Sequence, residues 1–570
     1  MDRRSFLKSG SLGLGGMVLG GSQLPWLIKD AVAASVASGQ PWKFGVMADT
    51  QWTATASGTD PINNPGTCAA GIIRALNQQF INHGVKFVVQ VGDLVDKETW
   101  TVSSASGYSD PFGYAGGTTG IRTLPYRAWA AQDLYDAGIG FFPVRGNHEA
   151  SATAANEMPL LFPQVTGSDK LFGVSNVIAS SNSQLEGLSY AFDFDNVRIV
   201  LIDQFTRKNN TNYNGSSNNN AVDQVAWVDS TLADRPSDMH AFVMSHKNLS
   251  GQNHKDCLFG SSSTSNQTSR DAFIASLDAN KVGFYLGGHD HMHYRSIIKN
   301  SGMTKSTEQI ICASNSYKFY IPKTPYDAYE KAVAQELFTV GFYIFTVDGP
   351  SVTVDFYSAS HGGDYGDADL TLTPDMTFFK RERFGYSLNG KEFVVANNEA
   401  YSVVQDSFQG TAFKILDGVN ADTANDSDYG ARDQVKTVKT GWKDRPQGCS
   451  SAVLKLWGLA NNLSLFNAAL EGALPAADGD YVTDTYVASL SYDATSIRPS
   501  QLVTGRFCIA ARNDDGEWIN AVDLNEGGTR KFVLGRWKST YALGTFGVDP
   551  TTKTAWAVLN RDGEFVVRNI

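Results

Sequence analysis

The sequence predicts an α/β domain followed by a mostly β domain, and three patterns support this fold class. Over the first 360 residues, short apolar runs alternate with segments whose apolar residues recur at helical spacing. Several of the runs are apolar throughout, which is typical of strands in a sheet covered on both faces. Beyond residue 376, the helical pattern gives way to paired apolar runs separated by Asp-Gly turns.

The first domain alternates expected strands with expected helices. Residues 69–83 have apolar side chains at helical spacing, and Gly84 follows them as a C-cap. Residues 126–137 and residues 222–233 show the same pattern. The expected strands are residues 43–48, 85–91, 140–144, 241–244, 282–286, 310–313 and 341–357, with a hairpin over residues 188–203. This alternation predicts one α/β domain over residues 40–360.

Four polar segments interrupt the periodic pattern. Residues 99–120, 209–220 and 260–269 are rich in Gly, Ser, Asn and Thr, so we expect solvated loops there. The alternative is that they frame a substrate cleft. Residues 361–375 are polar and begin with a glycine-rich run, and we expect them to link the two domains.

Residues 376–570 form the second expected domain. Strand-like runs flank Asp515-Gly516 and Asp562-Gly563, and both pairs are hairpin signals. Trp518 and Trp556 are expected in its core, with sugar-stacking platforms as the alternative. This part has no cluster of Asp, His or Cys residues, so the sequence assigns it no catalytic role.

The overall composition limits the class of protein. The chain has 570 residues, 42% hydrophobic and 18% charged, which is typical of a soluble globular protein with more than one core. Its formal net charge is −11, so we expect no broad surface for nucleic acid. An anionic substrate would have to be held locally, by metal ions and a few cations.

The cysteines do not form a recognisable pattern. They are Cys68, Cys257, Cys312, Cys449 and Cys508. An odd number without a Cys-x-x-Cys pair argues against a zinc knuckle and against a disulfide framework. A single bridge between Cys449 and Cys508 stays open if the protein reaches an oxidising compartment.

The first 34 residues resemble a twin-arginine export signal. Arg3-Arg4 precedes a glycine-rich apolar stretch, and Ala31-Val32-Ala33 has small residues at the spacing that signal peptidase reads. The alternative is an uncleaved anchor, but the glycines keep the hydrophobicity low for a stable span. We therefore expect the twin-arginine machinery as a partner, cleavage near Ala33, no stable membrane span afterwards, and a periplasmic or extracytoplasmic location.

Five polar blocks each follow an expected strand. They are Asp49-Thr50-Gln51, Gly92-Asp93-Leu94-Val95-Asp96, Gly146-Asn147-His148-Glu149, Ser245-His246 and Gly287-Gly288-His289-Asp290-His291-Met292-His293. If the last block stays extended, its three histidines lie on one side of the chain. Neutral imidazole is the commonest metal-ligating side chain, so this block favours a metal site over a set of surface histidines.

The order of the blocks resembles that of the calcineurin-like metallophosphoesterase family. The family order is Asp-x-His, Gly-Asp-x-x-Asp, Gly-Asn-His-Glu, a lone His and Gly-His-x-His, and it is met here over roughly residues 42 to 358. One position departs, because Gln51 stands where the family usually has histidine. The resemblance implies a β-sandwich flanked by helices, with two divalent metal ions.

The resemblance also implies which residues hold the ions. One ion would take Asp49, Gln51 and His291; the other would take Asn147, His246 and His289; Asp93 would bridge both. Carboxylate, imidazole and amide oxygen suit Mn, Fe or Zn. The amide oxygen of Gln51 is a poorer donor than imidazole, which favours Mn or Fe over zinc.

Further residues receive roles with open alternatives. By resemblance His148 is the general acid or an anion stabiliser, and Asp96 is placed to pair with it or to cap a helix. Lys97 and Arg145 either hold the substrate phosphate or are surface cations. His293 either contacts substrate or is simply exposed. The remaining histidines, expected to be structural or exposed, are His83, His240, His254 and His361.

These observations predict an exported metal-dependent hydrolase of phosphoric esters, either a phosphatase or a phosphodiesterase. A hydroxide that bridges the two ions would be the nucleophile. One alternative is a nucleotide-specific hydrolase. Another is a cell-surface binding protein with a degenerate metal site, although only one ligand position is changed. A purple acid phosphatase is disfavoured, since that group has a tyrosine ligand where this chain has Asp96.

Overall fold

The computed structural model describes most of the chain outside its first 38 residues. The described residues are 39–52, 68–102, 121–166, 171–211, 221–320, 322, 327–360, 376–388, 391–395, 412–415, 436–443, 445–457, 485–495 and 497–570. The expected export signal, the expected linker 361–375, His361 and most of the loops 99–120 and 209–220 lie outside them.

The first sheet of the N-terminal domain has six strands in the order β16-β15-β14-β1-β2-β5. β1 pairs in parallel with β2 and antiparallel with β14, and β2 pairs in parallel with β5. The strands are β1 (Trp42–Met47), β2 (Phe87–Val91), β5 (Gly140–Val144), β14 (Thr339–Asp348), β15 (Ser351–Ser360) and β16 (Phe379–Ser387). The predicted strand 341–357 is therefore wrong, because Gly349 (φ +55°) turns the chain and makes a hairpin of it.

The second sheet has eight strands in the order β13-β11-β12-β10-β9-β8-β7-β6. Its central strands β8, β9, β10 and β12 are parallel. The strands are β6 (Ser175–Ala179), β7 (Tyr190–Phe194), β8 (Val197–Ile202), β9 (His240–Ser245), β10 (Phe284–Gly287), β11 (His293–Lys299), β12 (Ser306–Ile311) and β13 (Glu330–Glu336). A further short ribbon is formed by β3 (Thr101–Val102) and β4 (Ile121–Arg122).

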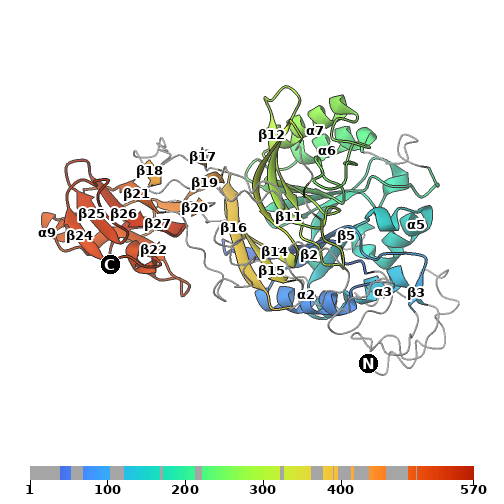
Figure 1. Cartoon of the computed structure of the whole chain (residues 1–570), viewed down its shortest axis with the longest axis horizontal. Coiled ribbons are helices and arrows are strands. Elements are labelled where there is room, and N and C mark those ends of the chain that lie inside the picture. The colour runs from blue at the N-terminus through green and yellow to red at the C-terminus, as the bar shows by residue number, and fades with distance from the viewer. Residues whose placement is uncertain are drawn as a thin grey trace.

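The two sheets pack face to face through aromatic side chains. Phe44 of β1 lies 4.5 Å from Phe345 and 5.4 Å from Phe242, measured between ring centroids, and Phe242 belongs to the second sheet. Helices cover the outer faces, with α2 beneath the first sheet and α6 and α7 above the second in Figure 1. The helices are α2 (Ala70–His83), α3 (Thr123–Trp129), α4 (Gln132–Asp136), α5 (Ala152–Leu161), α6 (Val225–Ala233) and α7 (Gln267–Ala279).

This arrangement confirms the predicted architecture, a β-sandwich of mixed sheets flanked by helices and followed by a mostly β region. The predicted helix 126–137 is in fact two short helices, α3 and α4. No helix among the described residues is both long and apolar enough to cross a membrane. All five cysteines are buried and free, so Cys449 and Cys508 are not bridged.

The described residues of the C-terminal region include two sheets, in the orders β17-β19-β20-β27-β22-β23 and β18-β21-β26-β25-β24. The region lies beyond β16 in Figure 1. Its strands are β17 (Lys391–Val395), β18 (Ala412–Ile415), β19 (Lys436–Lys443), β20 (Val453–Trp457), β21 (Tyr486–Ser491), β22 (Phe507–Arg512), β23 (Trp518–Asn520), β24 (Lys531–Leu534), β25 (Thr545–Asp549), β26 (Thr554–Leu559) and β27 (Gly563–Asn569), with one short helix, α9 (Pro499–Leu502).

Two sequence signals in this region have different outcomes. The hairpin at Asp515-Gly516 is present, because β22 and β23 pair antiparallel across it. The hairpin at Asp562-Gly563 is wrong, since β26 and β27 belong to different sheets. Trp556 is buried and donates a hydrogen bond from Nε1 to the Gly535 carbonyl, so it is a core residue. Trp518 is half-buried, with the Arg512 guanidinium 4.5 Å above its ring.

The boundary between the two parts lies later than the sequence indicated. β16 comes after residue 376 but pairs with β15 of the first sheet, from Ser351↔Ser387 to Ser358↔Phe379. Phe384 and Tyr386 of β16 belong to the hydrophobic core of the first domain. The strand therefore completes the sandwich of the first domain.

Candidate metal centre

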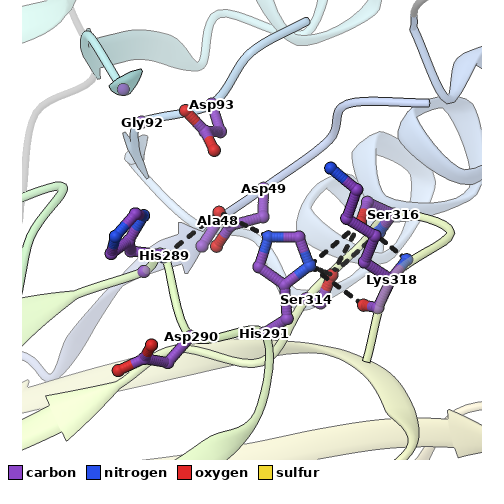
Figure 2. A network of polar contacts seen from close by, with 12 residues as sticks. Ala48, Asp49, Gly92, Asp93, His289, Asp290, His291, Ser314, Ser316 and Lys318 are labelled. Atoms are coloured by element: carbon purple, nitrogen blue, oxygen red, sulfur yellow. Dashed lines mark hydrogen bonds and ion pairs between the residues drawn. The ribbon is translucent and has the colours of Figure 1, made fainter. Parts of the chain in front are cut away.

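The five polar blocks meet where β1, β2, β5, β9 and β10 end. Asp49, Asp93, Asn147, His246 and His289 each follow one of these strands, so the two sheets bring them together. Two groups of potential ligands occur among the described residues, Asp93/His246/His289 and Asp49/Asp93/His291. Within each group the donor atoms lie within 4.8 Å of one another, and Asp93 belongs to both. Figure 2 shows Asp49 between His289 and His291, with dashed contacts to both, and Asp93 beyond it.

The donor atoms have the properties of a cation site. Oδ2 of Asp49 and Oε1 of Gln51 are buried and have no hydrogen-bond partner, a costly state that a bound cation would relieve. Burial, together with the nearby Asp93, raises the pKa of Asp49 well above its usual value. Burial has the same tendency at Asp93, but His246 and His148 hold the pKa of that carboxyl well below its usual range. The residues present therefore fit two divalent ions that share Asp93.

Hydrogen bonds orient the imidazole rings. His246 Nδ1 lies 3.0 Å from the Val91 carbonyl, and His291 Nδ1 lies 2.9 Å from the Lys318 carbonyl. Both contacts place the N–H at Nδ1 and leave Nε2 for a metal. His289 Nε2 instead lies 3.4 Å from Asp256 Oδ1. Burial lowers the pKa of His291 to about 3, so this ring is neutral and able to act as a ligand at ordinary pH.

Glycines allow the loops to approach closely. A Cβ on Gly146 would lie 1.9 Å from Asp93 Oδ1, and one on Gly288 would lie 2.5 Å from Asp49 Oδ2. Gly92 has φ +91°, and a Cβ there would meet the His246 ring at 2.4 Å. Any larger residue at these positions would displace a ligand.

Four of the ligand residues have left-handed backbone. The φ angles are 48° at Asp49, 44° at Asp93, 70° at His289 and 53° at His291. The last block is therefore not extended, and its three histidines do not share one side. His293 begins β11 and is buried, with Nδ1 2.8 Å from the Tyr343 hydroxyl and Nε2 2.8 Å from Glu382 Oε2. The prediction that His293 contacts substrate or is exposed is wrong.

His148 lies over the shared carboxylate. Its backbone N–H donates to Asp93 Oδ1 at 3.1 Å, and its Nε2 lies 3.8 Å from Asp93 Oδ2. Its Nδ1 lies 2.6 Å from the Asp96 carbonyl and 3.4 Å from Asp96 Oδ1. Burial opposes the charged ring, but Asp93 and then Asp96 raise the pKa of His148. Its neighbour Asn147 places Oδ1 2.9 Å from His246 Nε2, beside the group of Asp93, His246 and His289.

The basic residues predicted to hold the substrate phosphate lie elsewhere. Arg145 is completely buried and forms five hydrogen bonds, two to Asp203 and three to backbone carbonyls. A guanidinium has five N–H donors, so none is left for a substrate, and the prediction for Arg145 is wrong. Lys97 is exposed, with its ammonium 5.0 Å above the Trp100 ring.

Sequence reasoning missed several residues around the centre. His254 lies beside His289, with 4.3 Å between ring centroids, and its Nδ1 is held by Asp290 Oδ1 at 2.9 Å. Tyr320 packs against His291 at 5.1 Å. Lys318 lies next to His291 on the side away from His289, as Figure 2 shows. Residues 246–254 (HKNLSGQNH) end in a second histidine close to ligand His246, and this could have indicated His254. No sequence pattern indicated Lys318.

Comparisons with known proteins agree with this site. Residues 43–293 match the family model described as calcineurin-like phosphoesterase, so this part of the chain has the metallophosphoesterase fold, and both ligand groups lie within it. No curated protein matches the sequence significantly.

Three solved structures resemble the chain at low identity. A purple acid phosphatase from yellow lupin (Lupinus luteus) seeds is 11% identical with a TM-score of 0.35, over 57% of this chain and 52% of that chain. GAP50, the anchor in the inner membrane complex of Plasmodium, is 13% identical with a TM-score of 0.31, over 56% and 84%. A dimetal phosphatase from Danio rerio is 16% identical with a TM-score of 0.32, over 55% and 95%. The match spans about half the length of the lupin protein.

Proposed function

We propose that this protein is an exported, metal-dependent hydrolase of phosphoric esters. The observation that carries the proposal is the position of Asp93, which belongs to both ligand groups and lies beneath His148. Two divalent ions bound there would lower the pKa of a water molecule and neutralise charge on a phosphoryl group. The ligand set is Asp49, Gln51, Asp93, Asn147, His246, His289 and His291.

The protein residues would supply orientation and a proton. Val91 and Lys318 carbonyls fix the rings of His246 and His291, so the ligands do not have to reorganise when ions bind. His148 would donate a proton from Nε2 to the leaving oxygen of the ester, because that nitrogen faces the shared carboxylate and the ring is partly exposed. Asp96 holds Nδ1 of the same ring through its carbonyl oxygen.

Manganese or iron is the proposed metal. In the group of Asp49, Asp93 and His291 there are two carboxylates, and Gln51 would add an amide oxygen where histidine would add nitrogen. A site rich in oxygen suits manganese better than zinc.

A combined metal analysis and hydrolysis panel tests the proposal. Protein purified without chelator should contain two divalent ions per chain, and it should hydrolyse aryl phosphate monoesters, diesters or nucleotides. Activity should disappear with a chelator and return with manganese. Protein that binds two ions yet hydrolyses none of these esters would contradict the proposed function and favour a binding protein.

Export rests on the first residues of the chain. Arg3-Arg4 and Ala31-Val32-Ala33 support transport by the twin-arginine machinery, with cleavage near Ala33. The N-terminal sequence of protein isolated from the cell envelope should begin near residue 34. Replacing Arg3-Arg4 by two lysines should leave the protein in the cytoplasm, whereas envelope protein that still begins at Met1 would contradict the proposal.

A further inference from the structure

Lys318 contacts the metal centre through both its backbone and its side chain. It follows β12, and its carbonyl oxygen accepts the hydrogen bond from His291 Nδ1 at 2.9 Å. Its ammonium nitrogen lies 4.0 Å from Asp96 Oδ1. Asp96 in turn holds His148 through its carbonyl. Lys318 therefore contacts ligand His291 through its carbonyl and approaches Asp96, which supports the proposed general acid, through its ammonium.

Two neighbours fix the position of the ammonium. The Lys318 Nζ atom lies 4.8 Å from the centroid of the Tyr317 ring. Burial and the nearby Asp96 carboxylate raise the pKa of the Tyr317 hydroxyl, so the same ring lies close to Asp96. The Lys318 side chain is still 26% exposed, and 4.0 Å is too long for a hydrogen bond to Asp96. Its three N–H donors are thus available to a ligand.

Other cations around the centre are less suitable. Arg145 has no donor left, and Lys247 is buried and paired with Asp256. Lys97 is exposed, but its ammonium lies above Trp100. Among these described residues, Lys318 alone combines exposure with contacts to both His291 and Asp96.

We propose that Lys318 binds a non-bridging oxygen of the substrate phosphoryl group and thereby selects phosphate monoesters over diesters. This inference rests on the proposed hydrolase function. A monoester carries between one and two negative charges at neutral pH, because its second pKa is about 6, whereas a diester carries one. A cation beside the ions adds attraction for the second charge. It also needs an oxygen without an ester substituent, and a monoester offers one more of these.

Substitution of Lys318 tests the selection. Lys318→Met removes the charge and keeps the length, so kcat/KM for 4-nitrophenyl phosphate should fall about 10- to 100-fold, the usual worth of a hydrogen bond to a charged group. For bis(4-nitrophenyl) phosphate the loss should stay below about threefold, in the range of weak, solvent-exposed charge effects. Lys318→Arg should retain most of the monoester activity, and metal content should not change in either variant. Lys305→Met is a matched control, since Lys305 is exposed and paired with Asp278.

Phosphate binding separates this inference from the proposed function. Inorganic phosphate should bind the manganese-loaded wild type about tenfold more tightly than manganese-loaded Lys318→Met, as measured by calorimetry. If neither protein hydrolyses any ester but this difference remains, the hydrolase function fails and phosphoryl binding by Lys318 stands. The inference would be overturned if kcat/KM of Lys318→Met fell equally for monoester and diester, or if it did not change. A wild type that prefers diesters would also overturn it.

Discussion

Asp93 and His289 take part in the centre to different extents, and this difference can be measured. Asp93 belongs to both ligand groups, and His289 belongs to one. Asp93→Ala should therefore lose both ions, while His289→Ala should retain about one of the two, and both variants should lose hydrolysis. Mass spectrometry of bound metal and turnover of an aryl phosphate would test this. Near-normal turnover in either variant would exclude a shared dinuclear site.

His148 should affect chemistry and leave metal binding intact. Its ring contacts Asp93 and Asp96, but it belongs to neither ligand group. His148→Ala should slow hydrolysis of an alkyl phosphate by about 10²- to 10⁴-fold, the usual contribution of a general acid. The loss should be smaller for a nitrophenyl ester, whose leaving oxygen hardly needs a proton. Equal losses on both substrates would mean that His148 is not the acid.

Gln51 should set the metal preference. Its Oε1 is buried without a partner, and an amide binds metal only through this neutral oxygen. Gln51→His should bind the first ion more tightly and shift the preference from manganese towards zinc. Titration of the two metals into both proteins would show it. If affinities and ranking are identical, Gln51 is not a ligand.

The order of the motifs identified the ligand residues, but the roles of individual residues depend on tertiary packing that short sequence patterns do not reveal. Spacing put Asp49, Asp93 and His246 at strand ends, and the structure gathers them. The sequence could not show that the Arg145 guanidinium is paired with Asp203, because the two residues are 58 positions apart. Lys318 belongs to no motif, and only the path of the chain after β12 brings it beside His291.

At the scale of loops, the close approach at Gly146 should be as necessary as a ligand. A methyl group there would overlap Asp93, with 1.9 Å to Oδ1 and 2.2 Å to the backbone nitrogen. Gly146→Ala should therefore abolish activity and reduce bound metal, measured by turnover and mass spectrometry. Gly302→Ala is a matched control, since the nearest atom would lie 3.7 Å away. A fully active Gly146→Ala variant would mean that the loop is not held as described.

Periodic elements were predictable, and departures from periodicity were not. Apolar runs such as β5 were identified because burial on both faces leaves a clear pattern. The histidine block was misread because its period of two holds only in extended backbone, and His289 and His291 are left-handed. His293 therefore turns towards Glu382, an interaction between β11 and β16 that spans 89 residues.

At the scale of the whole molecule, β16 links the two sheets of the first domain, and Asp348 of β14 links that domain to the C-terminal region. Glu382 of β16 accepts hydrogen bonds from His293 and Arg295, both buried in the second sheet. Further along, Lys443 and Lys455 of the C-terminal region pair with Asp348 of β14. The polar, glycine-rich start of residues 361–375 led the sequence analysis to place the boundary before β16.

Truncation should show how far the stability of the first domain depends on β16. A chain that ends at residue 375 lacks β16 and leaves Arg295 without Glu382, and breaking a buried ion pair costs about 3–5 kcal/mol. It should unfold at a lower temperature than a chain that ends at residue 388, which keeps the strand. Thermal unfolding followed by circular dichroism would compare them, and equal midpoints would show that β16 contributes little to the first domain.

The left-handed backbone at Asp49, Asp93, His289 and His291 also bears on attempts to make the protein more robust. Each non-glycine residue in that region costs about 1–2 kcal/mol relative to ordinary backbone, less where a short polar side chain hydrogen-bonds locally. Laboratory evolution for heat resistance in metal-free buffer should therefore favour glycine or asparagine at these four positions. Variants obtained by such a selection would be more thermostable but inactive. A useful selection for stability would therefore have to supply the metal throughout.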